Sequence, residues 1–106
     1  MSKRKNKLSP VHPGEVLREE FMKPLNLSAS AVAKGLGVTP AAVNLLIRGR
    51  RGVSAELALR LARYVGTTAE FWMGLQGQYD LDIAQDEAEE RIAREVHRCP
   101  LFPAAA

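Results

Sequence analysis

The sequence predicts an all-α domain of five helices that continues into a C-terminal amphipathic helical extension. Apolar residues recur at the three- and four-residue spacing of a helix face, and serine, threonine, proline and glycine stand where helices begin and end. No segment shows the alternating pattern of a half-buried strand. A chain of 106 residues suffices for one domain with one core.

Composition excludes several classes of protein. Hydrophobic residues make up 46% and charged residues 25%, which is ordinary globular usage, and no apolar run approaches the roughly 18 residues of a membrane-spanning helix. The basic start, MSKRKNKLSP, is not followed by the apolar segment of a secretory signal. The single cysteine, Cys99, excludes an internal disulfide, and with His97 it would make half a metal site at best. We expect a soluble cytoplasmic protein that uses no metal and no cofactor.

The first helix is predicted over residues 13–23. In His12-Pro13-Gly14-Glu15, a proline stands where a first turn tolerates one, and an acidic residue stands where the helix dipole favours it. The end of the helix is marked by Pro24 and Asn26. Apolar residues at helical spacing are expected to face the core, namely Val16, Leu17, Phe21 and Leu25.

Two short helices are predicted next. Ser28 is suited to cap a helix over residues 29–36, and Gly37 is suited to the left-handed position just past its end. Thr39 is suited to cap a third, shorter helix that begins at Pro40. The inward-facing residues of the pair are Val32, Ala33, Leu36, Val43 and Leu46.

Two further helices complete the pattern. Ser54 opens the fourth helix and Gly66 ends it, with a buried face of Ala58, Leu61, Ala62 and Val65. Thr67 and Glu70 fit a capping box at the start of the fifth helix. An aromatic-rich stripe on this helix is predicted to be core and not a cofactor site, namely Phe71, Trp72, Leu75 and Tyr79. Beyond it, DLDIAQDEAEERIAREVH predicts an amphipathic helix with an apolar side of Leu81, Ala84, Ala88, Ile92 and Val96.

The most informative segment is SASAVAKGLGVTPAAVNLLIRG, residues 28–49. It places two short capped helices on either side of a Gly-Val-Thr turn, which is the arrangement of a helix-turn-helix. The small side chain of Ala33 allows close packing, and Gly37 takes the turn geometry. Val38 and Val43 fill the space between the helices. Each of these residue types stands at the position that the motif requires, so a helix-turn-helix is predicted.

Charge is divided unevenly along the chain. Residues 1–63 carry a net charge of +8 and residues 64–106 a net charge of −5, within a total of +3. One interpretation is that the basic half faces phosphates and the acidic half faces a protein. The alternative is that these charges only solvate the surface. The predicted parts are a basic flexible arm at 1–10, the helix-turn-helix DNA-binding domain at 11–79, a helical extension at 80–98 and a loose tail at 99–106. The arm either adds phosphate contacts or is a solvated tail, and its basic residues are Lys3, Arg4, Lys5 and Lys7.

The longer segment SASAVAKGLGVTPAAVNLLIRGRRGVS resembles the DNA-binding core of XRE/Cro-like helix-turn-helix proteins. Its flanks, HPGEVLREEF and LALRLARYVGTTAEFWMGLQGQYDLDIA, resemble the HigA (VapI) antitoxins of bacterial toxin-antitoxin systems. This resemblance covers residues 12–84 and implies a five-helix, lambda-repressor-like domain. It further implies a homodimer that represses its own promoter at a palindromic operator and neutralises a HigB ribonuclease toxin of the RelE-like class. Ala29 departs from the family, which often carries a glutamine there to seat the second helix.

The third helix is the candidate recognition helix, because such a helix presents its first turns to base edges in the major groove. The amide of Asn44 can pair bidentately with an adenine, and Ala41 can touch a thymine methyl. The arginines after the helix are expected to hold phosphates. The candidate DNA-binding residues are Ser28, Thr39, Pro40, Ala41, Asn44, Leu45, Arg48, Arg50 and Arg51.

One short recognition helix makes too few base contacts for a unique site, so two copies about one helical turn apart are expected. The candidate dimer contacts are apolar and away from the DNA face, namely Trp72, Leu75, Tyr79, Leu81, Ala88 and Ile92. An acidic run either suits a basic, RNA-cleaving toxin or is a solvated helix face, and the N-terminal segment is an alternative toxin contact. The run comprises Asp80, Asp82, Asp86, Glu87, Glu89 and Glu90.

The sequence does not indicate an enzyme, because it offers two widely spaced histidines and no paired-carboxylate or nucleophile motif. No membrane partner or small-molecule substrate is predicted. Three functions remain: an antitoxin that binds operator DNA and a toxin, a stand-alone XRE-type repressor without a toxin, and an interaction module in which the helix-turn-helix is a scaffold. A neighbouring gene for a RelE-like protein would favour the first, and its absence the second. The third would be favoured by a lack of DNA binding at low salt.

Overall fold

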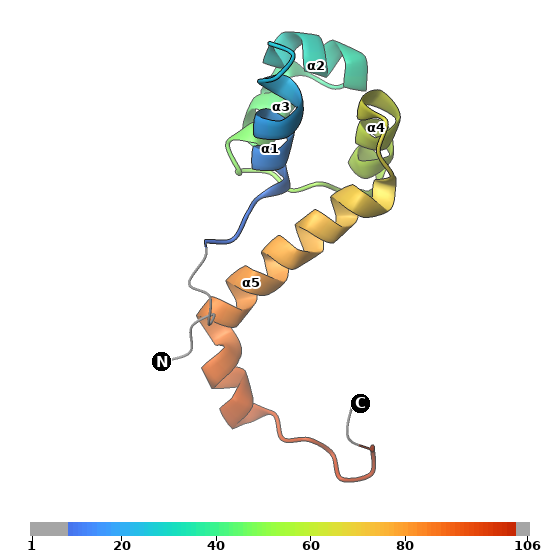
Figure 1. The fold of residues 1–106 in the computed structure, drawn as a ribbon. Coiled ribbons are helices and arrows are strands. Elements are labelled where there is room, and N and C mark those ends of the chain that lie inside the picture. The colour runs from blue at the N-terminus through green and yellow to red at the C-terminus, as the bar shows by residue number, and fades with distance from the viewer. Residues whose placement is uncertain (1–8, 104–106) are drawn as a thin grey trace.

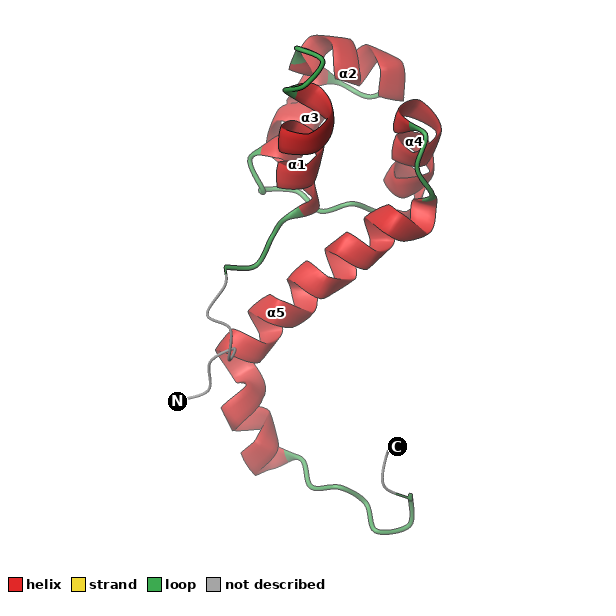
Figure 2. Cartoon of the chain, viewed as in Figure 1, coloured by secondary structure: helices red, strands yellow, loops and turns green. Residues whose placement is uncertain are grey.

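The computed structural model describes residues 9–103. It consists of five helical rods, the first made of α1 (Pro13–Val16) and the π-helix η1 (Leu17–Met22) in direct succession (Figure 1). The others are α2 (Ala29–Leu36), α3 (Pro40–Ile47), α4 (Ala55–Val65) and α5 (Ala69–Glu95). No strand occurs among the described residues (Figure 2), so the all-α prediction is confirmed. The arm residues Lys3, Arg4, Lys5 and Lys7 lie outside the described part of the chain.

The helices form a head and a projecting rod. Helices α1 to α4 make up the head, and α5 begins beside α4, runs past the head and continues beyond it (Figure 1). The principal-axis extents of 53 × 27 × 21 Å reflect this elongated shape. Within residues 9–103, no single helix is both long enough and apolar enough to cross a membrane.

Helices α2 and α3 form the predicted helix-turn-helix. Their axes are bent by 114°, which lies in the range of this motif. Gly37 adopts a left-handed conformation with φ of 74°, and the next amide donates back to the Ala33 carbonyl at 3.0 Å. The predicted bounds of α2 and the predicted start of α3 are confirmed. The prediction that α3 is the shorter helix is wrong, because both have 8 residues.

The hydrophobic core lies within the head, and the first turn of α5 adds Trp72 to it. Trp72 of α5 is fully buried and packs against Phe21 with a ring-centroid distance of 5.6 Å. Every rod of the head contributes side chains around it. The buried apolar residues are Leu17, Met22, Val32, Ala33, Leu36, Val43, Leu46, Val53, Leu57, Ala58, Leu61 and Trp72.

The first rod differs from the prediction in its hydrogen bonding. From Leu17 onward it is a π-helix, in which the Lys23 amide donates to the Arg18 carbonyl five residues earlier. Leu17 and Met22, five residues apart, are therefore buried on one face. Leu25, predicted from α-helical spacing to face the core, is 72% exposed. That prediction is wrong because the helix ends at Met22 and Leu25 lies in the turn that follows it.

Side-chain caps begin the helices, and three of them were predicted. The hydroxyl oxygens of Ser28, Thr39 and Ser54 each accept a hydrogen bond from the amide three residues later, at 3.1, 3.1 and 3.2 Å. The capping box at Thr67 is wrong, because Thr68 caps α5 instead. The hydroxyl oxygen of Thr67 accepts the indole N–H of Trp72 at 2.7 Å. This buried indole needs an acceptor, and Thr67 supplies it.

Helix α5 is a single helix of 27 residues, so the aromatic-rich stripe and the amphipathic extension belong to one element. It runs without a break across residue 79, where the sequence analysis places the end of the domain, and ends at Glu95. Of the predicted core stripe only Trp72 is buried, while Phe71 is 40% exposed. The outer half of α5 projects past the head and cannot pack on it.

A substitution at Gly14 tests the contact between α1 and α3. A Cβ added to Gly14 would overlap the carbonyl oxygen of Leu46, which is rigid backbone. We expect Gly14→Ala to lower the free energy of unfolding by about 1–3 kcal/mol or more, the usual cost of overpacking. Urea denaturation would measure this loss.

Gly74→Ala is the matched control. A Cβ at Gly74 of α5 would meet nothing within 4 Å. Alanine is the better helix former by about 0.5–1 kcal/mol, so this variant should be slightly more stable than the parent. Equal effects of the two variants would contradict the close approach of α1 to α3.

Candidate nucleic-acid interface

Helix α3 has one buried face and one exposed face. Val43 and Leu46 are 1% and 2% exposed and fix the helix in the core. The opposite face carries the residues that the sequence predicts to meet DNA, and all of them are exposed. They are Pro40, Ala41, Asn44 and Leu45, with Arg48 at the C-terminal cap and Thr39 at the N-terminal cap.

Residues 48–53, here called the arginine loop, follow directly on α3. Their three arginines, Arg48, Arg50 and Arg51, are exposed. The Arg50 amide donates to the Leu45 carbonyl at 2.9 Å, which ties the start of the loop to α3. At the other end of the loop, Val53 is only 4% exposed. The loop thus presents three cations beside the exposed face of α3 while both of its ends are fixed.

The predicted residues Ser28 and Thr39 have a structural role as caps. Each hydroxyl oxygen accepts an amide hydrogen bond at 3.1 Å, and both residues are exposed. A capping hydroxyl retains its own hydrogen, which it can donate to a phosphate or a base. Contact of these residues with DNA therefore stays a prediction that is compatible with their structural role.

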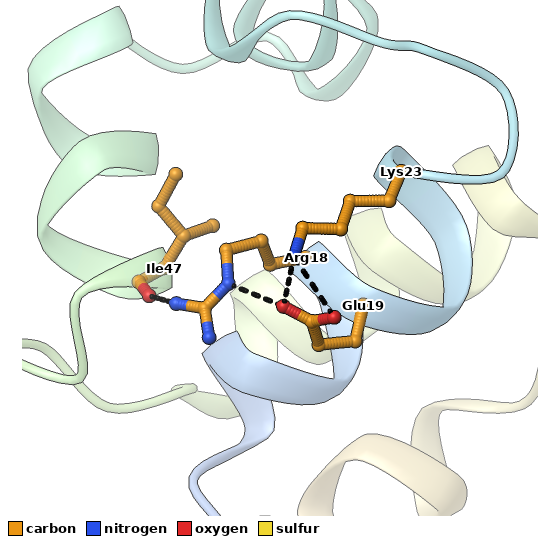
Figure 3. Close-up of polar contacts among 4 residues, drawn as sticks. All are labelled: Arg18, Glu19, Lys23 and Ile47. Carbon is orange, nitrogen blue, oxygen red and sulfur yellow. Dashed lines mark hydrogen bonds and ion pairs between the residues drawn. The ribbon is translucent and has the colours of Figure 1, made fainter.

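Arg18 of η1 stabilises the far end of α3 and was not predicted. Its Nη1 donates to the Ile47 carbonyl at 2.8 Å, one of the carbonyls that the end of a helix leaves unpaired (Figure 3). The guanidinium is oriented by Glu19, which also accepts from Lys23 (Figure 3). These two hydrogen bonds, from Lys23 and then Arg18, hold the pKa of Glu19 below its ordinary value.

His12 joins three parts of the structure. Its Nδ1 accepts the Gly14 amide at 2.9 Å and caps α1. Its ring meets Tyr79 of α5 edge-on, with centroids 4.8 Å apart. Burial lowers the pKa of His12 below the ordinary 6.5, while the charge of Asp80 and a hydrogen bond with the Arg51 backbone oppose this shift. The imidazole is therefore held between α1, α5 and the arginine loop.

The candidate dimer contacts separate into three groups by exposure. Trp72 is fully buried inside its own protomer, so its assignment to a dimer surface is wrong. Leu81 and Ile92 on the outer half of α5 are 50% and 45% exposed and are accessible to a second chain. Leu75, Tyr79 and Ala88 are half-buried.

Among residues 9–103, no group of three or more His, Cys, Asp or Glu side chains is placed to hold a metal ion.

Comparison with known proteins identifies the family. Residues 19–72 match the helix-turn-helix family. The chain belongs to this family, in its XRE type. It is 47% identical to virulence-associated protein I of Dichelobacter nodosus, over 80% of this chain and 79% of that protein. It is 42% identical to antitoxin HigA-1 of Vibrio cholerae, over 82% of each protein. The resemblance to HigA (VapI) antitoxins is thereby confirmed.

Solved structures of two antitoxins resemble the whole fold. Antitoxin GraA in complex with its operator is 47% identical with a TM-score of 0.82, over 91% of this chain and 97% of that one. Pseudomonas aeruginosa antitoxin HigA with the higBA promoter is 43% identical with a TM-score of 0.81, over 88% of this chain and 99% of that one. The predicted fold class, a five-helix helix-turn-helix domain, is confirmed.

Titration of His12 should make stability depend on pH. The folded protein holds the His12 pKa below 6.5 although Asp80 and Glu15 pull it upward. Below a pH of about 6.5, the unfolded chain therefore binds the proton more readily than the folded chain. We expect the free energy of unfolding to fall as pH decreases through this range. Urea denaturation at a series of pH values measures the trend.

His12→Asn provides the comparison, because asparagine caps helices well but does not titrate. The variant should lose the part of the pH dependence that His12 causes. If the parent and the variant changed equally with pH below about 6.5, another group would be responsible.

Proposed function

We propose that this chain is a HigA-type antitoxin that binds operator DNA as a homodimer, represses its own transcription and neutralises a RelE-like ribonuclease toxin. The observation that carries the proposal is the exposed face of α3, which lies next to three exposed arginines on a helix-turn-helix core. Solved antitoxins with this fold, GraA and HigA, are in complex with operator or promoter DNA, which supports the DNA-binding part. The protein would act in the cytoplasm, where its DNA and its partner are found.

The proposed DNA contacts divide into two kinds. Asn44 is exposed near the middle of α3 and would read a base, because an amide can donate to and accept from one adenine edge. The arginine loop would neutralise phosphates and fix the register of α3 in the groove. Base contacts therefore come from the helix, and most of the salt-dependent affinity comes from the loop.

Dimerisation is proposed through the outer half of α5. One α3 helix covers too few base pairs to define a unique operator, so a second copy is needed. Leu81, Ile92 and Val96 are 50%, 45% and 65% exposed, and burying these apolar side chains against a second chain would be favourable. Tyr79 and Leu75, which are half-buried, are the proposed continuation of this surface toward the head.

Capture of a toxin is the third part of the proposal. Residues 64–106 carry a net charge of −5, and their acidic side chains are concentrated on α5. An RNA-cleaving toxin must bind a polyanion, so its surface is expected to be basic and complementary to this helix. Such complementarity would speed association and select the partner more than it would raise affinity.

The test of the proposed function is binding of the purified protein to its own upstream DNA over a salt series, with and without the protein encoded beside it. Specific binding that weakens steeply with salt and changes when the neighbour is added supports an antitoxin. Specific binding that ignores the neighbour leaves a stand-alone repressor. A lack of specific binding at low salt would move the function to protein capture alone.

Asn44→Ala separates base reading from general DNA binding. We expect a loss of about 1–3 kcal/mol on the parent operator and relaxed preference at one base pair of each half-site, because one bidentate contact is removed. A panel of operators with single base changes would measure it. An equal loss on every sequence would refute base reading by Asn44.

Arg50→Ala is the contrasting variant. Arg50 is exposed in the arginine loop, so its loss should weaken binding to all sequences alike. The slope of log affinity against log salt should decrease by about one per subunit, as expected for a lost phosphate contact. A change of preference at one base pair would instead assign base reading to Arg50.

A further inference from the structure

Helix α5 makes a direct hydrogen bond to the arginine loop. The side chain of Gln76 accepts the Val53 amide through Oε1 at 2.7 Å, across 23 residues of sequence. The nitrogen of the same side-chain amide, Nε2, donates to Asp80 Oδ1 at 2.9 Å. Gln76 is half-buried, and its bond to the Val53 amide is partly shielded from water, whereas its bond to Asp80 is exposed. The loop is thereby connected to α5 through a single side chain.

Close packing reinforces this contact. A Cβ added to Gly52 would lie 3.0 Å from Gln76 Oε1, so the loop backbone already rests against the amide group. Val53 beside it is 4% exposed and belongs to the core. A buried amide without an acceptor costs free energy, so loss of the Gln76 oxygen would favour a different path of the loop.

The contact from Gln76 bears on DNA binding because the loop carries exposed arginines. Arg50 and Arg51 stand just before the point where Gln76 holds the backbone, and both are exposed. An arginine binds a phosphate at a lower entropic cost if its backbone is already fixed in position before binding. His12 supports the same loop from the side of α1, through the Arg51 backbone, and touches α5 at Tyr79.

We infer that Gln76 is a positioning residue for DNA binding, which holds the arginine loop so that its guanidinium groups meet operator phosphates. This inference rests on the proposed function and adds a residue that lies on α5, outside the helix-turn-helix. Gln76 itself is not proposed to touch DNA. It acts on affinity through the loop backbone.

The decisive variant is Gln76→Ala, tested for operator binding over a salt series. We expect affinity to fall about tenfold and the slope of log affinity against log salt to decrease by about one per subunit, because a loop arginine loses its phosphate. Thermal unfolding of the same samples, and circular dichroism below the transition, show whether the helices are intact.

Gln78→Ala is the matched control. Gln78 donates to Asp82 at 2.9 Å, so it makes the same four-residue Gln–Asp contact on the same helix, but it is exposed and does not reach the loop. This variant should bind the operator as the parent does, with an unchanged salt slope.

Gln76→Glu combined with Asp80→Asn tests the hydrogen bonds themselves. The carboxylate introduced at position 76 can accept both the Val53 amide and the side-chain amide introduced at position 80, so both bonds are restored with no change in net charge. Gln76→Glu alone places two carboxylates together and should lower operator affinity. The double variant should recover the affinity and the salt slope of the parent.

Four outcomes would overturn the inference. Parent-like binding by Gln76→Ala would mean that the loop needs no support from α5. A loss of affinity with an unchanged salt slope, or a loss that the double variant does not recover, would assign Gln76 a general structural role. Failure of the parent protein itself to bind the operator would instead refute the proposed function, and with it this inference.

Discussion

Helix α3 has only 8 residues and buries only Val43 and Leu46, so its orientation is imposed by its neighbours. An isolated helix of this length is not stable in water. The backbone of α1 approaches so closely at Gly14 that a methyl group would overlap the Leu46 carbonyl. Arg18 then binds the Ile47 carbonyl at the end of the helix. The exposed face with Asn44 is presented in one direction because these contacts leave α3 no other position.

The arginine loop is held in place by polar contacts, whereas α3 is held mainly by packing. Gln76 accepts the Val53 amide, and His12 lies between the Arg51 backbone and Tyr79. On α5 these contacts involve Gln76 and Tyr79. The two residues are three positions apart, which places them on the same side of the helix. Polar contacts of this kind depend on direction, so they fix the path of a backbone more closely than apolar packing does. The loop can therefore be exposed and still have a defined position.

Local patterns predicted most of the head, and contacts between distant residues escaped prediction. The caps at Ser28, Thr39 and Ser54 depend on an amide three residues away, so the sequence alone identifies them. The exposed face of α3 followed from Val43 and Leu46 at helical spacing. Arg18 and Gln76 bind backbone atoms 29 and 23 residues away, and no periodicity marks such a contact. The Thr67 capping box was wrong because the Trp72 indole takes that hydroxyl.

Helix α5 carries two roles on one continuous helix. Its first half contributes Trp72 to the core and Gln76 to the loop, while its outer half exposes Leu81 and Ile92 beyond the head. A partner on the outer half would act on the arginine loop through movement of α5, because Gln76 of α5 binds the loop. A partner that leaves the helix in place keeps the Val53 hydrogen bond, so it would change DNA affinity only by blocking the proposed dimer surface. One that tilts α5 must break that bond or shift the loop, because Gly52 already rests against Gln76. Movement of α5 is therefore one route by which a partner would change DNA affinity, and occupation of the proposed dimer surface is another.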